Sequence, residues 1–201
     1  LTADTLQILD GGSISTVLYS IGPGADIEII AKNILISGVV IDNRISPPDI
    51  HASIDARVIG TYASGTGGNI SVAADNLQIT SGGFISSGLF GNAPGNAGGI
   101  TVKAGSLEVS DRGGIFASSV YGMGNAGRLD ITAKDIRIIG LQSSSDPFGK
   151  DFTGISIATN AGLGGDLRLT TDSLLVADRG SITAASYGSG HGGNIEINAG
   201  G

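Results

Sequence analysis

The sequence predicts an all-β protein, a right-handed parallel β-helix of about six coils, with about 29 residues and three short strands in each coil. A Gly-rich motif recurs along the chain, and short runs of alternating apolar residues follow each copy. No segment of helical length has the 3.6-residue apolar period of a helix. Right-handedness follows from the general rule for parallel crossovers. We therefore treat residues 1–201 as a single repeat domain.

The motif that anchors each coil is a Gly pair, a small or polar residue, and two apolar residues separated by one position. Clear copies begin at Gly67, Gly98, Gly164 and Gly192. Looser copies lie near Gly24 and Gly127. The leading apolar residues are Ile27, Ile70, Ile100, Leu129, Leu167 and Ile195. Period-two runs bounded by turn residues predict the first strand of each coil.

Two further strands per coil are predicted after each anchor. The second covers Leu6–Ile8, Ile34–Ile36, Leu77–Ile79, Leu107–Val109, Ile136–Ile138 and Leu174–Val176. The third follows a Gly corner in four units and contains Ile14, Ile85, Ile115 and Ile182. Such short strands cannot bury their apolar faces alone, so we expect parallel stacking with a rise of about 4.8 Å per coil.

Polar residues form a column just before the second strand: Thr5, Asn33, Asn76, Ser106, Asp135 and Ser173. We expect their side chains to hydrogen-bond between coils. The same oxygens could instead hold Ca²⁺, although Lys32 and Lys134 lie beside them. We predict no metal site and no cofactor.

Counting back from the anchors aligns the aromatic residues Tyr19, Tyr62, Phe90, Tyr121 and Tyr187, with Thr159 interrupting the series. The first interpretation is an aromatic stack along one edge of the rod. The alternative is a strip on which sugar rings stack.

Two insertions are predicted at one corner, after Gly38 (residues 39–52) and after Gly140 (residues 141–153). Because the offset from the anchor is the same, we expect both insertions on one edge of the rod. Insertions on one face of a solenoid often form its binding surface. The candidate contact residues in them are Arg44, Asp49, His51, Asp146, Phe148 and Lys150.

Composition excludes several classes of protein. The net charge is −7 and no run of Lys or Arg occurs, which argues against nucleic acid and anionic membranes as partners. No apolar segment reaches the length of a membrane span, so we predict no membrane insertion. The chain has no Cys and so no disulfide framework. Both ends fall inside the repeat pattern, which predicts a fragment of a longer chain.

Catalysis is not predicted. Polysaccharide-cleaving β-helices cluster acidic residues on successive coils, and the best candidates are Asp111–Arg112 and Asp178–Arg179. Both pairs precede a Gly at the same corner, which favours a turn. His51 and His191 lie in separate segments with no motif that pairs them with a nucleophile.

The segments 95–115, 117–119 and 121–127 resemble the repeats of filamentous-haemagglutinin-like exoproteins, and the segment 140–149 resembles their longer units. That resemblance implies secretion by the two-partner route, through an outer-membrane barrel, to the bacterial cell surface or medium. It also implies a structural or adhesive role, with cell-surface glycans or other copies of the chain as partners. The alternative function is that of a polysaccharide-binding or polysaccharide-degrading β-helix.

Overall fold

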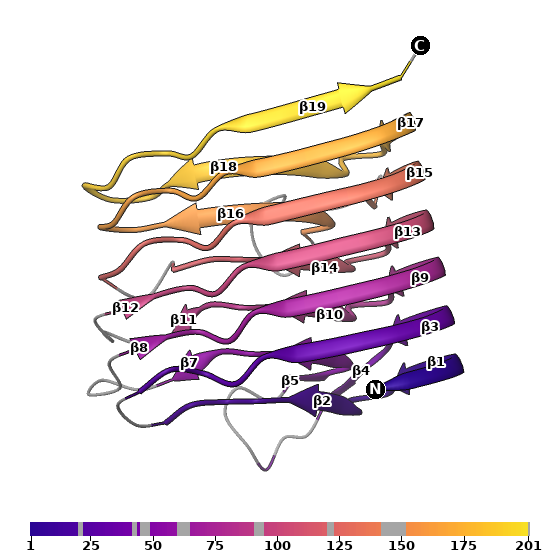
Figure 1. The fold of residues 1–201 in the computed structure, drawn as a ribbon, viewed down its shortest axis with the longest axis horizontal. Helices are drawn as coiled ribbons and strands as arrows, with labels where there is room; N and C mark the ends of the chain where they lie inside the picture. Colours follow the sequence, from indigo (N-terminus) through magenta and orange to yellow (C-terminus); the bar gives the residue numbers. More distant parts are fainter. Residues whose placement is uncertain are drawn as a thin grey trace.

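The structure is a computed structural model that describes residues 1–19, 22–41, 44, 49–59, 65–90, 95–119, 123–141 and 152–200. Within them the chain forms a parallel β-helix. Its coils stack in sequence order from the N-terminal to the C-terminal end (Figure 1). The predicted fold class is therefore confirmed.

One face of the rod is a sheet of seven parallel strands in the order β1-β3-β9-β13-β15-β17-β19. Their bounds are Thr2–Leu9, Ile27–Ser37, Ile70–Thr80, Ile100–Ser110, Leu129–Ile139, Leu167–Ala177 and Ile195–Ala199. The register places Ile100 opposite both Ile70 and Leu129, and Ser106 opposite both Asn76 and Asp135. The predicted alignment of the anchors and of the polar column is thus correct.

The prediction of three separate strands per coil is wrong in one respect. The first and second predicted strands are continuous, as in the 11-residue strand β3. Lys32 and Asn33 are both exposed, whereas Ala31 and Ile34 on either side of them are buried. The alternation of side chains therefore shifts by one residue at a bend while the pairing between coils continues through Asn33.

The third predicted strand forms a second parallel sheet, in the order β18-β16-β14-β10-β6-β2. Its strands are Ser181–Ser186, Gly154–Thr159, Gly114–Phe116, Phe84–Ser86, Ser53–Asp55 and Ser13–Ser15. Two short parallel pairs close the coils: β7 (Val58–Ile59) with β11 (Leu89–Phe90), and β8 (Gly65–Thr66) with β12 (Gly95–Asn96). One antiparallel pair, β4 (Val39–Ile41) with β5 (Asp49–His51), lies in the first insertion.

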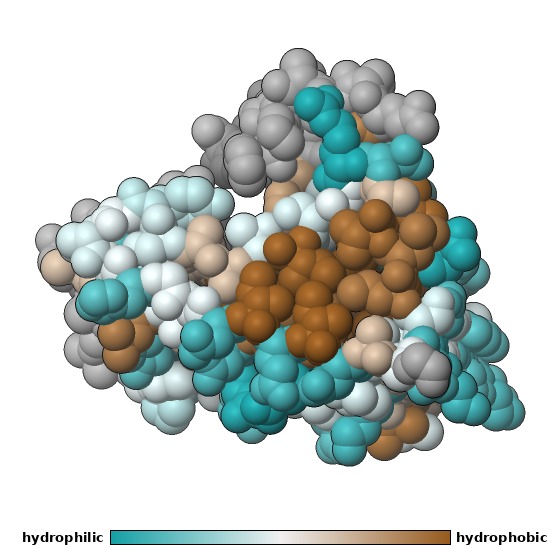
Figure 2. Space-filling model, turned by 90° about the horizontal axis from the view of Figure 1, so that it is seen from above, coloured by the Kyte–Doolittle hydropathy of each residue, from teal (hydrophilic) through white to brown (hydrophobic). Residues whose placement is uncertain are grey.

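The core consists of apolar columns between the two sheets. Ile29, Ile36, Ile54 and Ile85 are fully buried in it. Each such side chain contributes about 1.5–3 kcal/mol through burial. At the C-terminal end of the rod apolar side chains are exposed (Figure 2), including Val176, Ile195 and Ile197.

Glycine columns run along the turns between coils. At these positions the Cα–Cβ bond of any other residue would point along the rod, into the neighbouring coil. A Cβ at Gly98 would collide with the carbonyl oxygen of Gly68, and one at Gly127 with that of Gly98. A second column behaves in the same way, because a Cβ at Gly95 would meet the carbonyl oxygen of Gly65. The glycines of these two columns are therefore required by close stacking of the backbones.

Replacing Gly98 by Ala should destabilise the protein by about 2 kcal/mol, because two coils must separate to admit the methyl group. The matched control is Gly99→Ala at the adjacent residue, where the nearest atom to a new Cβ is 3.4 Å away. This control should change stability by less than about 0.5 kcal/mol. Denaturant unfolding of both variants measures the difference, and equal losses of stability would contradict the steric argument.

Candidate functional site

The described ends of the two insertions lie on the outer side of the second sheet. His51 lies near the end of the first insertion, and Phe152 lies near the end of the second. Between them, Phe84 on β10 and Phe116 on β14 project outward from the sheet. We call this surface the ladder face and define it by His51, Phe84, Phe116, Phe152 and the Asp55–Arg57 pair described below.

The four rings of the ladder face contact one another in series. The ring centroids of His51 and Phe84 lie 5.5 Å apart, those of Phe84 and Phe116 6.4 Å, and those of Phe116 and Phe152 5.7 Å. Adjacent rings are tilted by 47–64°, as is typical of packed aromatic side chains. A Cβ at Gly114 would collide with the ring of Phe116, so this glycine makes room for the ladder.

The two phenylalanines on the sheet do not occupy equivalent positions in their coils. Phe84 pairs with Gly114, and Phe116 pairs with Ser86. The two phenylalanines are therefore diagonal neighbours, within reach of large aromatic side chains on adjacent strands. Alignment of equivalent positions does not reveal this contact, which was therefore not predicted from the sequence.

The first insertion is a β-hairpin attached to the corner between coils. Val39 pairs with His51, and Ile41 pairs with Asp49. A Cβ at Gly11 would collide with Ile50, which places the Ile50 side chain on the preceding corner. The Nδ1–H group of His51 donates to the carbonyl oxygen of Gly82 at 2.7 Å. The hairpin therefore contacts the corner of the preceding coil through Ile50 and the corner of the following coil through His51.

A buried ion pair lies beside the first ring of the ladder. Asp55 on β6 is 3% exposed and accepts a hydrogen bond from Nε–H of Arg57 at 2.7 Å. The guanidinium of Arg57 lies 5.6 Å from the centroid of the Phe84 ring, within the range of a cation–π interaction. Burial raises the pKa of Asp55 above its usual range, although the charge and hydrogen bonds of Arg57 oppose this shift. In the sequence, the signal for this pair is the run Ser53-Ile54-Asp55-Ala56-Arg57, which places a carboxylate and a guanidinium two residues apart on one side of a strand.

The corner that carries the insertions contains a tight turn in four other coils. The four residue pairs at the centre of these turns are Asp10–Gly11, Ser81–Gly82, Asp111–Arg112 and Asp178–Arg179, and all eight residues have positive φ. A hydrogen bond closes each turn, as from Gly113 N–H to the Ser110 carbonyl at 2.8 Å. Positive φ at both central positions defines a type I′ turn. The turn interpretation of Asp111–Arg112 and Asp178–Arg179 is confirmed.

The predicted aromatic column is not continuous. Phe90 pairs with Ile59, whereas the predicted column placed it level with Tyr62, three residues further on. Thr159 pairs with Ser186 and Ser119 rather than with Tyr187 and Tyr121. The turns between these residues and the next anchor differ in length from coil to coil. Counting back a fixed number of residues from the anchors therefore does not give equivalent positions.

The other predicted contact residues have different surroundings. Tyr19 and Tyr187 are exposed, and so is Arg44. Asp49 is half-buried on β5. Tyr62, Tyr121, Asp146, Phe148 and Lys150 lie outside the described residues, as does the side chain of Phe90.

The polar column at the bend forms a ladder of side chains. The Nδ2 group of Asn76 donates to Oδ1 of Asn33 at 2.9 Å, and the hydroxyl of Ser106 donates to Oδ1 of Asn76 at 2.9 Å. The expected bonding between coils is present here between side chains. Among the described residues no group of three or more His, Cys, Asp or Glu side chains could hold a metal ion.

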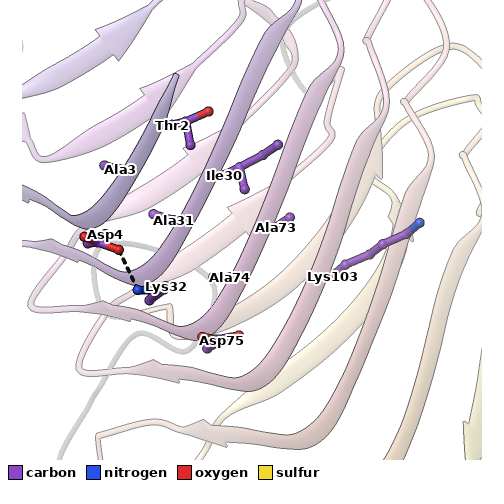
Figure 3. Close-up of a pocket in the computed structure, with 10 residues that line it drawn as sticks. All are labelled: Thr2, Ala3, Asp4, Ile30, Ala31, Lys32, Ala73, Ala74, Asp75 and Lys103. Carbon is purple, nitrogen blue, oxygen red and sulfur yellow. Dashed lines mark ion pairs between the residues drawn. The ribbon is translucent and has the colours of Figure 1, made fainter.

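A groove of about 600 Å³ crosses β1, β3, β9 and β13 near the bend (Figure 3). Ala73 and Ala74 line it between the larger Ile30 and Lys103. At its rim Asp4 and Lys32 form an exposed ion pair of 2.7 Å, a type of contact worth little in water. The charged residues that line the groove are Asp4, Asp75, Lys32 and Lys103, so its positive and negative charges balance and it offers no net charge for recognition.

Comparison with protein families, with curated proteins and with solved structures found no match to this chain. Within the described part of the chain, no helix long and apolar enough to cross a membrane is present. The ladder face is therefore assigned as the candidate site on its own geometry.

Removing one partner of the buried pair should cost much more than removing both. Arg57→Ala should destabilise the protein by about 3 kcal/mol at pH 7, because it leaves the Asp55 carboxylate buried and unpaired. The raised pKa of Asp55 means that the folded protein binds this proton more tightly than the unfolded chain. The loss should therefore shrink as the pH falls toward 4 and Asp55 becomes neutral.

The double variant Asp55→Ser/Arg57→Ala should recover most of that stability, since Ser156 and Ala158 occupy the equivalent positions three strands along the sheet. Thermal unfolding of the single and double variants at pH 7 and pH 4 is the measurement. A double variant as unstable as Arg57→Ala would show that the pair itself holds the sheet together.

Arg112→Gly should stabilise the protein by about 0.5–1 kcal/mol, because Arg112 has a φ of 64°, where a side chain is disfavoured. Glycine fills the equivalent position in two of the four turns. The control is Arg137→Gly on β15, exposed in extended backbone, which should destabilise by about 0.5–1 kcal/mol. Denaturant midpoints distinguish the two, and a loss of stability in Arg112→Gly would show that its side chain outweighs the backbone strain.

Proposed function

We propose that this chain is a structural and adhesive segment of an exported bacterial surface or extracellular filamentous protein. The supporting observation is the ladder face, where two insertions separated by about three coils return to one side of a regular rod. Stacked coils supply rigid length at about 4.8 Å each, and the insertions supply a surface that departs from the repeat. Export through an outer-membrane partner is what the resemblance of the repeats to filamentous-haemagglutinin-like exoproteins implies.

In this proposal the partner is a cell-surface glycan or another copy of the chain. Aromatic side chains at the ladder face are half-buried, so they combine contact area with little loss of side-chain entropy on binding. The net charge of −7 favours neutral over strongly acidic glycans, because like charges repel at long range.

A polysaccharide-degrading β-helix is the second candidate, and Asp55 is the observation that favours it. A buried carboxyl with a raised pKa is a property of general acids in glycoside cleavage. Against this reading, the hydrogen bonds and ion pair from Arg57 occupy the carboxylate of Asp55.

Binding of the purified chain to an array of neutral and acidic polysaccharides tests the adhesive proposal. We expect binding to neutral glycans and a loss of at least about tenfold in Phe84→Ala/Phe116→Ala, as for a binding surface that loses two central aromatic side chains. Met123→Ala, at an exposed residue outside the ladder face, is the control and should bind as the unaltered chain does.

The same glycans should keep their length after prolonged incubation with the protein. Shortening of a glycan that Asp55→Asn or Asp111→Ala abolishes would establish the degrading alternative and overturn the adhesive one. Unchanged binding by the double aromatic variant would remove the ladder face from the proposal.

A further inference from the structure

Two separate sets of contacts connect the first insertion to the second. The first set is the aromatic ladder, which begins at His51 and ends at Phe152. The second set passes through the corner turns. His51 donates to the Gly82 carbonyl at 2.7 Å, and the Gly82 N–H donates to the Asp111 carbonyl at 2.9 Å.

The turn contacts continue to the end of the second insertion. The N–H of Arg112 donates to Oγ1 of Thr153 at 2.8 Å, and Thr153 is 1% exposed. The hydroxyl of Ser81 also donates to the carboxylate of Asp111 at 3.2 Å, which ties the two turns together. Both sets therefore share His51 at one end, and they finish on the consecutive residues Phe152 and Thr153.

The hairpin at the first end has little stability of its own. An isolated two-stranded hairpin is marginal in water, and β4–β5 has three residues in each strand. Its exposed residues Val40 and Ile41 face solvent and contribute little to holding it. Its order therefore depends on the contacts that Ile50 and His51 make with the corners.

We propose that strands β4 and β5 of the first insertion and residues 152–153 of the second form one coupled surface, in which the order of each part depends on the other through the ladder and the turns. A partner that engages either insertion then alters the other one. Packed rings and short hydrogen bonds are suited to this, because close-packed groups transmit displacement. The proposal deepens the adhesive function and rests on it only for the existence of a partner.

Hydrogen exchange of backbone amides, followed by NMR in the unliganded full chain, tests the coupling. In Phe152→Ala we expect the amides of Val39–Ile41 and Asp49–His51 to exchange at least threefold faster. In His51→Ala we expect the Arg112 amide, which donates to Thr153, to exchange at least threefold faster. Coupling between two sites is reciprocal, so both effects must occur.

The amides of β13 serve as an internal reference, because this central strand exchanges slowly only while the coils are intact. Phe152→Leu is measured alongside and should give a smaller effect in the same amides. Tyr187→Ala, which removes an exposed aromatic ring, is the control and should leave the hairpin amides within twofold of the unaltered chain.

Two further variants separate the routes. Phe116→Leu weakens the ladder alone, and Thr153→Val removes the turn contact alone, so each should have part of the effect of Phe152→Ala on the hairpin. The proposal is overturned if Phe152→Ala accelerates exchange only within its own insertion while β13 is unchanged. Failure to bind any glycan would defeat the proposed function and leave this measurement unaffected.

Discussion

Neighbouring coils of this protein stack at the spacing of paired strands, about 4.8 Å, and no side chain fits between backbones at that distance. Where the chain is extended, side chains point into the core or out to solvent, and the spacing does not restrict them. Where the chain turns, the Cα–Cβ bond can point along the rod. Gly68, Gly98 and Gly127 form one such column, in which each glycine lies against the carbonyl of the one before. The glycines of these columns thus reflect close packing along the axis.

That constraint leaves the corners and outer faces free to vary. A type I′ turn at the corner can be replaced by an insertion, as after Gly38, because the inserted chain leaves the stack and returns to it at the same height. Ala52 N–H donates to the Gly38 carbonyl at 2.9 Å, which closes the first insertion at its base. The outward positions of the second sheet then lie beside the returning chain, and there Phe84 and Phe116 form the ladder.

The register of the long sheet was predictable because its anchors, such as Ile70 and Ile100, precede a stretch of constant length. The aromatic column was not, because turns of unequal length separate Tyr19 and Phe90 from the next anchor. The ladder face could not be found by aligning repeats, since Phe84 and Phe116 belong to different columns. His51 and Phe152 belong to no column, as they come from insertions. The sequence thus predicts the contacts that recur from coil to coil. Contacts between non-equivalent positions can be identified only from the three-dimensional structure.

Comparison of the coils also shows what stability alone requires at each position, because different coils place different residues at equivalent positions of the same stack. At the positions of Asp55 and Arg57, another coil has Ser156 and Ala158, which need no buried charge. At the position of Arg112, two other turns have glycine, which has no strain at positive φ. Asp55, Arg57 and Arg112 are therefore choices that stacking does not explain. The Arg57 guanidinium lies over the Phe84 ring, so the buried pair is explained by the ladder face and not by the stack. The contact of Arg112 with Thr153 is made by the backbone N–H, and it would remain with glycine at this position.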